Sequence, residues 1–393
     1  NNRRLLFEMA TGTGKTRTAI VACKQVLDEG KPALFVVATP QSTLSQQWKD
    51  SFDDLEIKFD ATIIADSSNH KWRKNLELAC LDLEIGMLDS LIVFTTHATA
   101  SSRDFISMVS TISKQIRTVF VGDETHGLGS SKQRAALLER YDYRIGLSAT
   151  PSRWFDDEGS ALIKKYYSDK SFVFSIDDAL TTINPLTNMT FLTPYQYHLV
   201  RVYLDFEEMI EYEKLSKKIS RLFAIKESSS DENEALENAL FKRANLIKNA
   251  AAKIPALQKI LRERTVENTL IFVSPQQIDT VIALMKNLKI MAKRFTMKEG
   301  TKPSEQFGGL SERQHIIRCF VEKDYKALIA ISCLDEGIDI PSAETAFLVS
   351  SSTNPREYIQ RIGRVIRRSP GKTKAEIFDF VAIPNYKQMD GID

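Results

Sequence analysis

A short glycine-rich segment, 9–16, constrains the fold of this chain more than any other stretch. It reads Met-Ala-Thr-Gly-Thr-Gly-Lys-Thr, and it lies between an apolar run at 5–7 and a helical pattern that begins at Thr18. A strand, a glycine-rich turn, a Lys-Thr pair and a helix follow one another in a phosphate-binding loop. Gly12 and Gly14 allow the backbone to turn its N–H groups toward phosphate oxygens at the positive end of the helix dipole. The segment therefore predicts a nucleotide-binding α/β fold.

The polar residues of this segment have separate expected roles. Lys15 supplies a point charge that can reach the β- and γ-phosphates of ATP, and Thr16 offers its hydroxyl to Mg²⁺. We expect the nucleotide to lie against the turn and the start of the helix, which are Gly12, Thr13, Gly14, Lys15 and Thr16. Met9 stands where the longer phosphate-loop pattern has its first glycine, so the match is to the shorter ending 10–16. The competing interpretation is a glycine-rich turn with a solvated lysine.

Length and charge set the broad class of the protein. The chain has 393 residues, which exceeds one ordinary hydrophobic core and predicts two domains. Its 43% hydrophobic and 26% charged residues are typical of a soluble globular protein. Because 53 basic and 51 acidic residues leave a net charge of +2, any nucleic-acid-binding surface must be a local groove. The chain opens almost directly on its first strand and without an initiator methionine, so we expect a piece of a longer protein.

The four cysteines, at positions 23, 80, 319 and 333, show no Cys-x-x-Cys pairing and lie in apolar strings. This pattern favours reduced, buried thiols in a cytoplasmic protein, or a nuclear one in a eukaryote, over zinc ligands or disulfides. No apolar run approaches the length of a membrane span and no signal peptide is visible, so no membrane partner is expected.

The first half of the chain alternates strand-like apolar runs with helical patterns. The runs occur at 5–7, 33–38, 91–96, 118–123 and 144–150. Runs without polar alternation indicate parallel strands that are buried on both faces of a sheet. In such folds, ligands bind at the carboxyl ends of the strands. Polar residues stand at several of these ends, among them Thr39, Thr96, Asp123 and Ser148.

A second alternating unit has no phosphate loop of its own, and its apolar runs lie at 270–273, 327–331, 346–349 and 377–381. Before it, 207–225 and 235–261 have apolar residues at helical spacing, with a break expected at Pro255. The sequence therefore predicts two tandem α/β domains with parallel sheets, joined by an inserted helical hairpin. The predicted boundaries are 1–178 for the first domain, 179–265 for the linker and hairpin, and 266–393 for the second domain. The hairpin is either a plain connector or a part that grips the substrate.

An acidic pair, Asp123 and Glu124, follows the apolar run 119–121. An aspartate there can hold the Mg²⁺ that Thr16 also touches, and the adjacent glutamate can orient and deprotonate water for attack on the γ-phosphate. The alternative is an ordinary acidic loop after a strand. The phosphate loop upstream makes the catalytic interpretation the favoured one.

The basic stretch 360–367 is the next strong signal. Arg364 and Arg367 are three residues apart and are expected to share one face of a helix. Two guanidinium groups so placed can stabilise the charge of phosphate oxygens during phosphoryl transfer. Since the second half has no phosphate loop, we expect these arginines to complete in trans the nucleotide site of the first half. The alternative is a solvated basic face of a helix.

In order along the chain, these segments resemble the motifs of superfamily 2 helicases and translocases, which have two RecA-like domains. The first matches are 10–16, Thr39-Pro40-Gln41 with Gln47-Trp48, Thr95-Thr96-His97, and Asp123-Glu124-Thr125-His126. The later matches are Ser148-Ala149-Thr150-Pro151, 270–274, 335–341 and 360–367. Eight motifs in order over nearly the whole chain are very specific. The branch resembles the DEAH-like group that includes XPB-like and RadD-like DNA helicases and the motor subunits of restriction enzymes.

The resemblance implies roles that residue chemistry alone leaves open. It implies that Gln360, Arg364 and Arg367 face the γ-phosphate, with the two arginines acting as fingers. It places Gly337 and Asp339 near the ribose and the water network of the nucleotide. It assigns the coupling of hydrolysis to movement to His126, Ser148 and Thr150. Contacts with the phosphates of a single strand are implied for Thr39, Gln41, Thr96, Ser274 and Ser332.

The resulting hypothesis is a helicase or translocase that uses ATP and Mg²⁺ in a cleft between its domains to move along a nucleic acid. The resemblance favours DNA over RNA. The alternatives are a double-strand DNA translocase that does not unwind, an RNA helicase, and a non-catalytic module that binds nucleic acid under nucleotide control. The presence of Lys15, Asp123, Glu124 and Arg364 argues against the non-catalytic module. Protein partners or accessory domains beyond this sequence are also expected.

Overall fold

The computed structural model describes residues 3–151, 156–168, 170–225, 230–296, 298–300, 303–331, 340, 342–351 and 355–386. The chain divides into two compact units, Asn1–Leu192 and Thr193–Asp393. The expected linker and hairpin, 179–265, is divided between the units: 179–192 belongs to the first and 193–265 to the second, where a strand from this region joins the second sheet.

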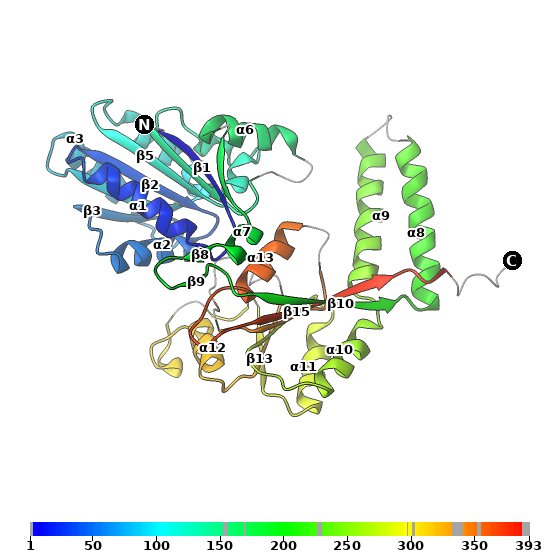
Figure 1. Ribbon diagram of the computed structural model, residues 1–393. Coiled ribbons are helices and arrows are strands. Elements are labelled where there is room, and N and C mark those ends of the chain that lie inside the picture. Colours follow the sequence, from blue (N-terminus) through cyan, green and yellow to red (C-terminus); the bar gives the residue numbers. More distant parts are fainter. Residues whose placement is uncertain are drawn as a thin grey trace. The chain divides into compact units, whose positions relative to one another are not determined.

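The first unit is built on a seven-stranded sheet whose neighbouring strands are all parallel (Figure 1). The strand order is β3-β4-β2-β5-β6-β1-β7. The strands are β1 (Arg4–Met9), β2 (Ala33–Thr39), β3 (Ala61–Ala65), β4 (Ser90–Thr96), β5 (Arg117–Asp123), β6 (Tyr143–Ser148) and β7 (Ser171–Phe174). The predicted parallel α/β fold is confirmed for the five apolar runs. Sequence reading missed β3 and β7, the two edge strands, and in β7 both Phe172 and Val173 are more than half exposed.

Helices cover both faces of this sheet, because successive strand side chains point to opposite sides. On one face, α1 (Lys15–Leu27) and α2 (Ser42–Asp54) pack against a core that includes Phe35 and Val37. On the other face, the core around Leu34 and Val36 takes in α3 (Trp72–Glu84), α5 (Arg103–Thr111) and α6 (Asp157–Tyr167). The shorter elements are α4 (His97–Ala100), α7 (Ile176–Thr181), β8 (Ile183–Asn184), β9 (Met189–Thr190) and the 3-10 turns Thr125–Gly129 and Arg134–Ala136.

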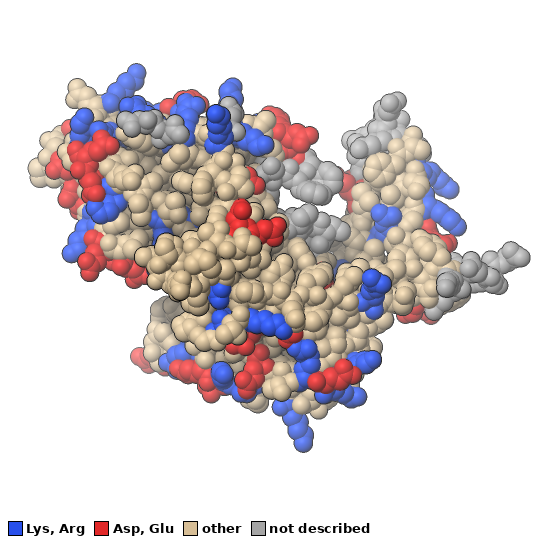
Figure 2. All heavy atoms as spheres, in the orientation of Figure 1, with Lys and Arg blue, Asp and Glu red and all other residues tan. Residues whose placement is uncertain are grey.

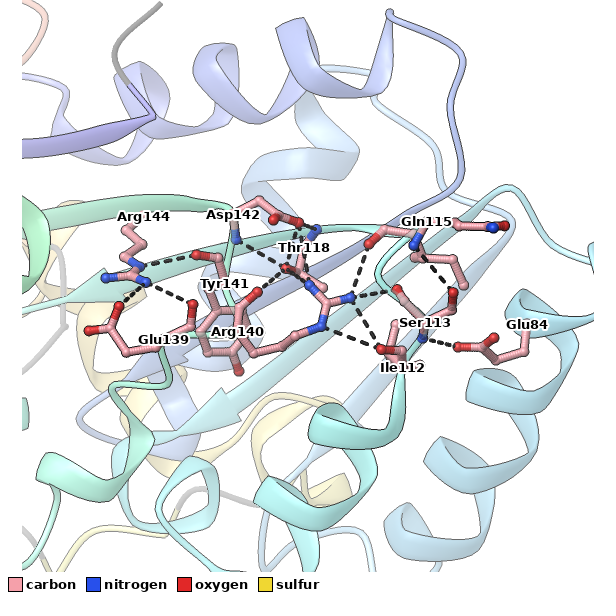
Figure 3. A network of polar contacts seen from close by, with 11 residues as sticks. Glu84, Ile112, Ser113, Gln115, Thr118, Glu139, Arg140, Tyr141, Asp142 and Arg144 are labelled. Atoms are coloured by element: carbon pink, nitrogen blue, oxygen red, sulfur yellow. Dashed lines mark hydrogen bonds and ion pairs between the residues drawn. The ribbon is translucent and has the colours of Figure 1, made fainter.

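A network of arginine contacts fixes the amino ends of β5 and β6 (Figure 3). Arg140 donates hydrogen bonds to the backbone carbonyls of Ile112, Ser113 and Ile116. The buried Arg144 donates to the Glu139 carboxylate at 2.8 Å, and its guanidinium lies 4.3 Å from the centre of the Tyr166 ring. These contacts lie at the opposite ends of the strands from the polar residues singled out by sequence, so their role is structural.

The second unit contains a six-stranded parallel sheet of order β10-β15-β14-β11-β13-β12. The strands are β10 (Tyr195–Tyr203), β11 (Thr269–Phe272), β12 (Ala292–Phe295), β13 (Ala327–Ala330), β14 (Thr345–Leu348) and β15 (Ala375–Ile383). Four of them were predicted as apolar runs. The edge strands β10 and β12 were not.

The helices of the second unit include the expected hairpin, formed by α8 (Phe206–Ile225) and α9 (Ser230–Lys248). The others are α10 (Lys253–Arg262), α11 (Ile278–Asn287), α12 (Glu312–Val321), α13 (Pro355–Val365) and the 3-10 turn Glu305–Phe307. The predicted break at Pro255 is displaced: the helix is interrupted at 249–252, and Pro255 lies in the first turn of α10. Proline is tolerated there because the first N–H groups of a helix have no intrahelical acceptor.

Cys23, Cys80 and Cys319 are buried, as predicted, and Cys333 lies outside the described residues. Burial raises the pKa of the Cys23 thiol and of the Cys80 thiol to about 12. Of the helices in the described ranges, none is long and apolar enough to cross a membrane.

Candidate functional site

The glycine-rich segment forms the turn between β1 and α1. Gly12 and Gly14 have φ angles of 88° and 95°, in the left-handed region that glycine adopts without steric cost. No side chain caps the start of α1, so the first N–H groups of this helix are available to an anion. A Cβ atom added at Gly14 would meet nothing within 4 Å. The turn is therefore open and suitably oriented for phosphate groups.

Internal contacts hold this turn in place. The Ala10 N–H donates to the carbonyl of Phe174 in β7 at 2.9 Å, and Lys15 Nζ donates to the Met9 carbonyl at 2.9 Å. The buried Thr13 side chain donates to the Ala10 carbonyl at 2.7 Å, so its hydroxyl stabilises the turn. Thr16 is half-buried in the first turn of α1.

Asp123 is the last residue of β5, and both oxygens of its carboxylate accept hydrogen bonds. Trp48 Nε1 donates to Oδ2 at 2.9 Å, and the N–H of Glu124 donates to Oδ1 at 3.0 Å. Burial, followed by the charge of Glu124, raises the pKa of Asp123 to about 6, whereas the Trp48 hydrogen bond and the charge of Lys15 oppose this rise. Only β6 separates β5 from β1 in this parallel sheet, so Asp123 and the glycine-rich turn lie at the same edge of the sheet.

Glu124 has φ and ψ angles of 48° and 55°, a left-handed backbone that costs a residue with a side chain about 1 kcal/mol. Its Oε2 lies 3.3 Å from Ser148 Oγ and 3.4 Å from His126 Nδ1. His126 Nδ1 is also 3.4 Å from Ser148 Oγ, and the N–H of Thr150 donates to that same hydroxyl at 3.1 Å. The structure thus brings together the expected water-activating residue and the three expected coupling residues.

Sequence reasoning gave no role to two residues that contact Asp123. Trp48 lies 75 positions away in α2, and His97 lies 26 positions away in α4. His97 Nε2 is 2.8 Å from the Asp123 carbonyl, and burial lowers the pKa of the imidazole to about 4, so this side chain is neutral near pH 7. A Cβ atom at Gly127 would lie 2.8 Å from His97 Nδ1, so a residue with a side chain does not fit at this position. Both residues stand in matched motifs, but spacing alone does not show which atoms they meet.

The structure corrects two of the contacts that were expected with the phosphates of a nucleic-acid strand. Thr39 is fully buried, and its hydroxyl interacts with the Gln41 carbonyl and with Ser45 Oγ. Ser274 is also buried, with its hydroxyl directed to Asn249 Oδ1. Neither hydroxyl is accessible to a phosphate, because each stabilises the start of the structure that follows its strand.

The remaining candidates for contact with a nucleic-acid strand differ in how accessible they are. Gln41 is half-buried at the start of α2, where its side chain makes no capping hydrogen bond. Thr96 is half-buried and caps α4 by accepting the N–H of Thr99 at 3.2 Å. Ser332 lies outside the described residues.

In the second unit, Gln360 and Arg364 lie on α13, Gln360 half-buried and Arg364 buried. The expectation that Arg364 and Arg367 share a helix face is wrong, because α13 ends at Val365. The chain leaves the helix there: Lys372 Nζ donates to the carbonyls of Val365 and Arg367, and the N–H of Thr193 donates to the Ile366 carbonyl at 2.7 Å. The other two expected nucleotide contacts, Gly337 and Asp339, lie outside the described residues.

Two family models match the chain. Residues 1–153 match the model described as type III restriction enzyme, res subunit, and residues 252–369 match the helicase conserved C-terminal domain. Over 389 residues the chain is 25% identical to a protein named DNA 3'-5' translocase XPB2 from Sulfurisphaera tokodaii. That comparison covers 93% of this chain and 75% of the relative.

Two solved structures share the arrangement of strands and helices. The ATP-dependent type ISP restriction-modification enzyme LlaBIII bound to DNA matches with a TM-score of 0.61 and 16% identity, covering 98% of this chain and 26% of that chain. The Hef helicase domain of Pyrococcus furiosus matches with a TM-score of 0.56 and 17% identity, covering 98% of this chain and 94% of that chain. At these identities the matches show the fold, which has two RecA-like domains.

Proposed function

The chain belongs to the superfamily 2 helicases and translocases, ATP-dependent nucleic-acid motors, and from this premise we propose that it hydrolyses ATP to move along DNA. The observation that carries the proposal is the group formed by Asp123, Glu124 and Ser148 beside the open turn of Gly12 and Gly14. A metal-binding carboxylate and a general base beside an anion-binding turn are what phosphoryl transfer to water requires.

In this proposal the turn and α1 bind the phosphates through backbone N–H groups, and Lys15 moves from the Met9 carbonyl to the β- and γ-phosphates. Glu124 orients the attacking water and accepts its proton. The contact of Glu124 with His126 and Ser148 makes the position of its carboxylate depend on the segment that follows β6. We assign the coupling of hydrolysis to movement to His126, Ser148 and Thr150 on this ground.

The residues present fit Mg²⁺. Asp123 and Thr16 offer oxygen atoms, which this ion prefers, and each carboxylate oxygen of Asp123 accepts one hydrogen bond from the groups described, which leaves room for a further partner. When bound with the nucleotide, the ion would neutralise charge on the β- and γ-phosphates. The indole N–H of Trp48 and the backbone N–H of Glu124 hold the Asp123 carboxylate in one orientation.

The second unit contributes Gln360, Arg364 and Arg367 to the reaction in this proposal, together with Gly337 and Asp339. The support is chemical: guanidinium groups stabilise phosphoryl-transfer charge, and the second unit has no phosphate loop to bind a nucleotide of its own. Arg364 lies on α13, whereas Arg367 lies in the segment that follows this helix.

The nucleic-acid contact in this proposal uses the edge where β2 and β4 end, with Gln41 and Thr96 as the contacting side chains. On the face shown in Figure 2, Lys and Arg are interspersed with Asp and Glu over the first unit and do not merge into a broad basic field. A net charge of +2 agrees with this distribution. Binding therefore rests on polar contacts to phosphates, which position a strand without reading its sequence. The relative named as a DNA translocase supports DNA as the substrate.

The experiment that tests the proposal measures ATP hydrolysis with and without Mg²⁺ and in the presence of single-stranded DNA, double-stranded DNA or RNA. Strand-displacement and triplex-displacement assays on the same substrates distinguish unwinding from translocation along an intact duplex. Hydrolysis that requires Mg²⁺ and is stimulated by DNA supports the proposal. Stimulation by RNA alone would favour an RNA helicase, and ATP binding without turnover would favour a non-catalytic module.

A further inference from the structure

Trp48 is a buried aromatic residue whose only polar atom is directed at the acidic pair. Its side chain is 2% exposed, and its Nε1 donates to Asp123 Oδ2 at 2.9 Å. Packing accounts for an aromatic side chain at this position, because the Trp48 ring lies 6.4 Å from the Phe52 ring, centre to centre, within the core beneath α2. Packing does not explain the N–H direction, because a phenylalanine would fill much of the same space without placing a donor at the carboxylate.

The helix that carries Trp48 begins at the edge where a strand of nucleic acid is expected. α2 starts at Ser42, directly after Gln41, and its first turn is tied to the end of the sheet because Ser45 Oγ donates to the Thr95 carbonyl at 3.2 Å. Trp48 lies three residues after Ser45, less than one turn further along the same helix. A displacement of α2 by a bound strand would therefore move the donor that holds Asp123.

A second helix from the same edge contacts the backbone of Asp123. His97 opens α4, directly after Thr96, and its Nε2 lies 2.8 Å from the Asp123 carbonyl. Asp123 is thus contacted through its carboxylate by α2 and through its carbonyl by α4. Both helices start at the carboxyl ends of neighbouring strands, β2 and β4.

We propose that Trp48 is a positioning residue: its indole N–H fixes the Asp123 carboxylate for Mg²⁺ and links that carboxylate, through α2, to the strand-binding edge. The inference rests on the proposed function, since it assigns a structural cause to nucleic-acid-stimulated hydrolysis. Trp48 is buried, so the role proposed for it is indirect and acts through Asp123.

Trp48→Phe removes the N–H and keeps a buried aromatic ring, and Trp72→Phe is the matched control. Trp72 is also buried in the first unit, but it packs against Phe105 in α5, on the opposite face of the sheet. We expect Trp48→Phe to weaken the binding of Mn²⁺, used as a paramagnetic substitute for Mg²⁺ with ADP, by roughly tenfold, the effect of losing one hydrogen bond to a charged group. Binding of ADP in the presence of EDTA is expected to stay unchanged in both variants, and Trp72→Phe is expected to bind Mn²⁺ as the parent does.

A second measurement follows ligand binding in the unaltered sequence and uses a variant only to assign a resonance. The protein is labelled with 5-fluorotryptophan, and the fluorine resonance of Trp48 is identified by its loss in Trp48→Phe. Addition of Mg²⁺ to the ADP complex, and separately of single-stranded DNA to the free protein, is expected to shift the Trp48 resonance and to leave the Trp72 resonance in place. The inference would be overturned if Trp48→Phe bound Mn²⁺ as tightly as the parent, or if neither ligand shifted the Trp48 resonance. In either case, DNA-stimulated hydrolysis by the parent would still support the proposed function.

Discussion

The left-handed backbone at Glu124 brings its carboxylate to Ser148 and His126, with oxygen–heteroatom distances of 3.3 and 3.4 Å. Glycine would occupy this backbone region at lower cost, so the local stability that glutamate sacrifices has to be offset by other contacts. Other non-glycine residues, among them Glu56 and Lys289, share this backbone region, so the conformation alone does not indicate function. The contacts that Glu124 makes with Ser148 and His126 favour the catalytic interpretation of the acidic pair over the structural one.

Glu124→Gln keeps the size and shape of the side chain but removes the base. We expect the variant to bind ATP with near-parental affinity and to lose turnover by at least about a hundredfold, the typical contribution of a general base. ATP binding by calorimetry and steady-state hydrolysis are the measurements. Glu158→Gln is the matched control, because the Glu158 side chain is 79% exposed and pairs only with Arg134 among the ion pairs of the described residues. Parental turnover in Glu124→Gln would show that another group activates the water.

Lys253 is a buried lysine whose removal is expected to stabilise the second unit near neutral pH. Burial lowers its pKa from 10.5 to about 8, with the charge of Asp379 opposing this shift. Between pH 8 and pH 10.5 the unfolded chain therefore binds more protons than the folded one, so the free energy of unfolding rises with pH across this window, by about 3 kcal/mol in total.

Lys253→Met keeps the length of the side chain and removes the charge. We expect a gain of about 1–3 kcal/mol in the free energy of unfolding at pH 7, shrinking toward zero near pH 10. Urea unfolding at both pH values measures it, and the exposed Lys259→Met on the same helix is the control. A loss of stability at pH 7 with an unchanged pH dependence would mean that the ammonium group is better solvated than its burial indicates.

At the scale of elements, β5 and β6 approach α6 closely because each has a glycine where Tyr167 packs. A Cβ atom at Gly122 would lie 2.2 Å from the Tyr167 hydroxyl, and one at Gly146 would lie 2.9 Å from Tyr167 Cγ. Among the described residues, the buried Tyr167 hydroxyl has no hydrogen-bond partner. The core therefore accepts an unsatisfied hydroxyl directly beneath the strand that ends in Asp123.

A double-mutant cycle tests this packing. We expect Gly122→Ala to lower the free energy of unfolding by about 1–3 kcal/mol through overpacking. Tyr167→Phe is expected to raise it by about 1 kcal/mol, because it removes a buried polar group that lacks a partner. Since the hydroxyl is the nearest clashing atom, Tyr167→Phe should recover part of the cost of Gly122→Ala. Strict additivity of the two effects in thermal unfolding would contradict the predicted contact.

Sequence reading found the buried central strands and missed the edges of both sheets. The central strands are continuous apolar runs because both of their faces are covered, whereas β10 alternates exposed and half-buried residues and contains His198 and Arg201. Its exposed side includes Leu199 and Tyr203, so an apolar/polar alternation does not mark this strand in the sequence. What joins β10 to the second sheet is its pairing with β15, a contact between distant residues that local pattern does not show.

The site was predictable where motifs carry the chemistry and unpredictable where tertiary contacts decide it. Lys15 and Asp123 follow from spacing, but the Trp48 hydrogen bond to Asp123 depends on how α2 lies on the sheet. The same holds for Thr39, whose position at a strand end suggested a phosphate contact although packing directs its hydroxyl inward. Position along the chain thus located the edge of the site, and packing selected the side chains that remain accessible there.

At the scale of the whole molecule, the near balance of 53 basic and 51 acidic residues limits how nucleic acid can be held. A strongly basic protein binds by releasing counterions, and its affinity falls steeply with salt. A net charge of +2 gives this chain no broad basic field, so binding is expected to come from a local groove. We expect hydroxyl, amide and backbone N–H contacts to phosphates to carry much of this binding, and such contacts are tolerant of sequence.

The last prediction concerns this mode of binding. Gln41→Ala is expected to weaken single-stranded DNA binding roughly fivefold, the effect of one lost hydrogen bond, and to leave ATP binding unchanged. Gln46→Ala is the control, because Gln46 lies on the same helix but is exposed and directs its amide to Asp50 at 2.8 Å. Fluorescence anisotropy with two unrelated strands across a salt series should give similar affinities and a log–log slope shallower than about −3, the value for four neutralised phosphates of a single strand. A steeper slope would reveal a basic groove, a strong preference for one strand would reveal base readout, and equal binding by Gln41→Ala and the parent would remove this edge from the interface.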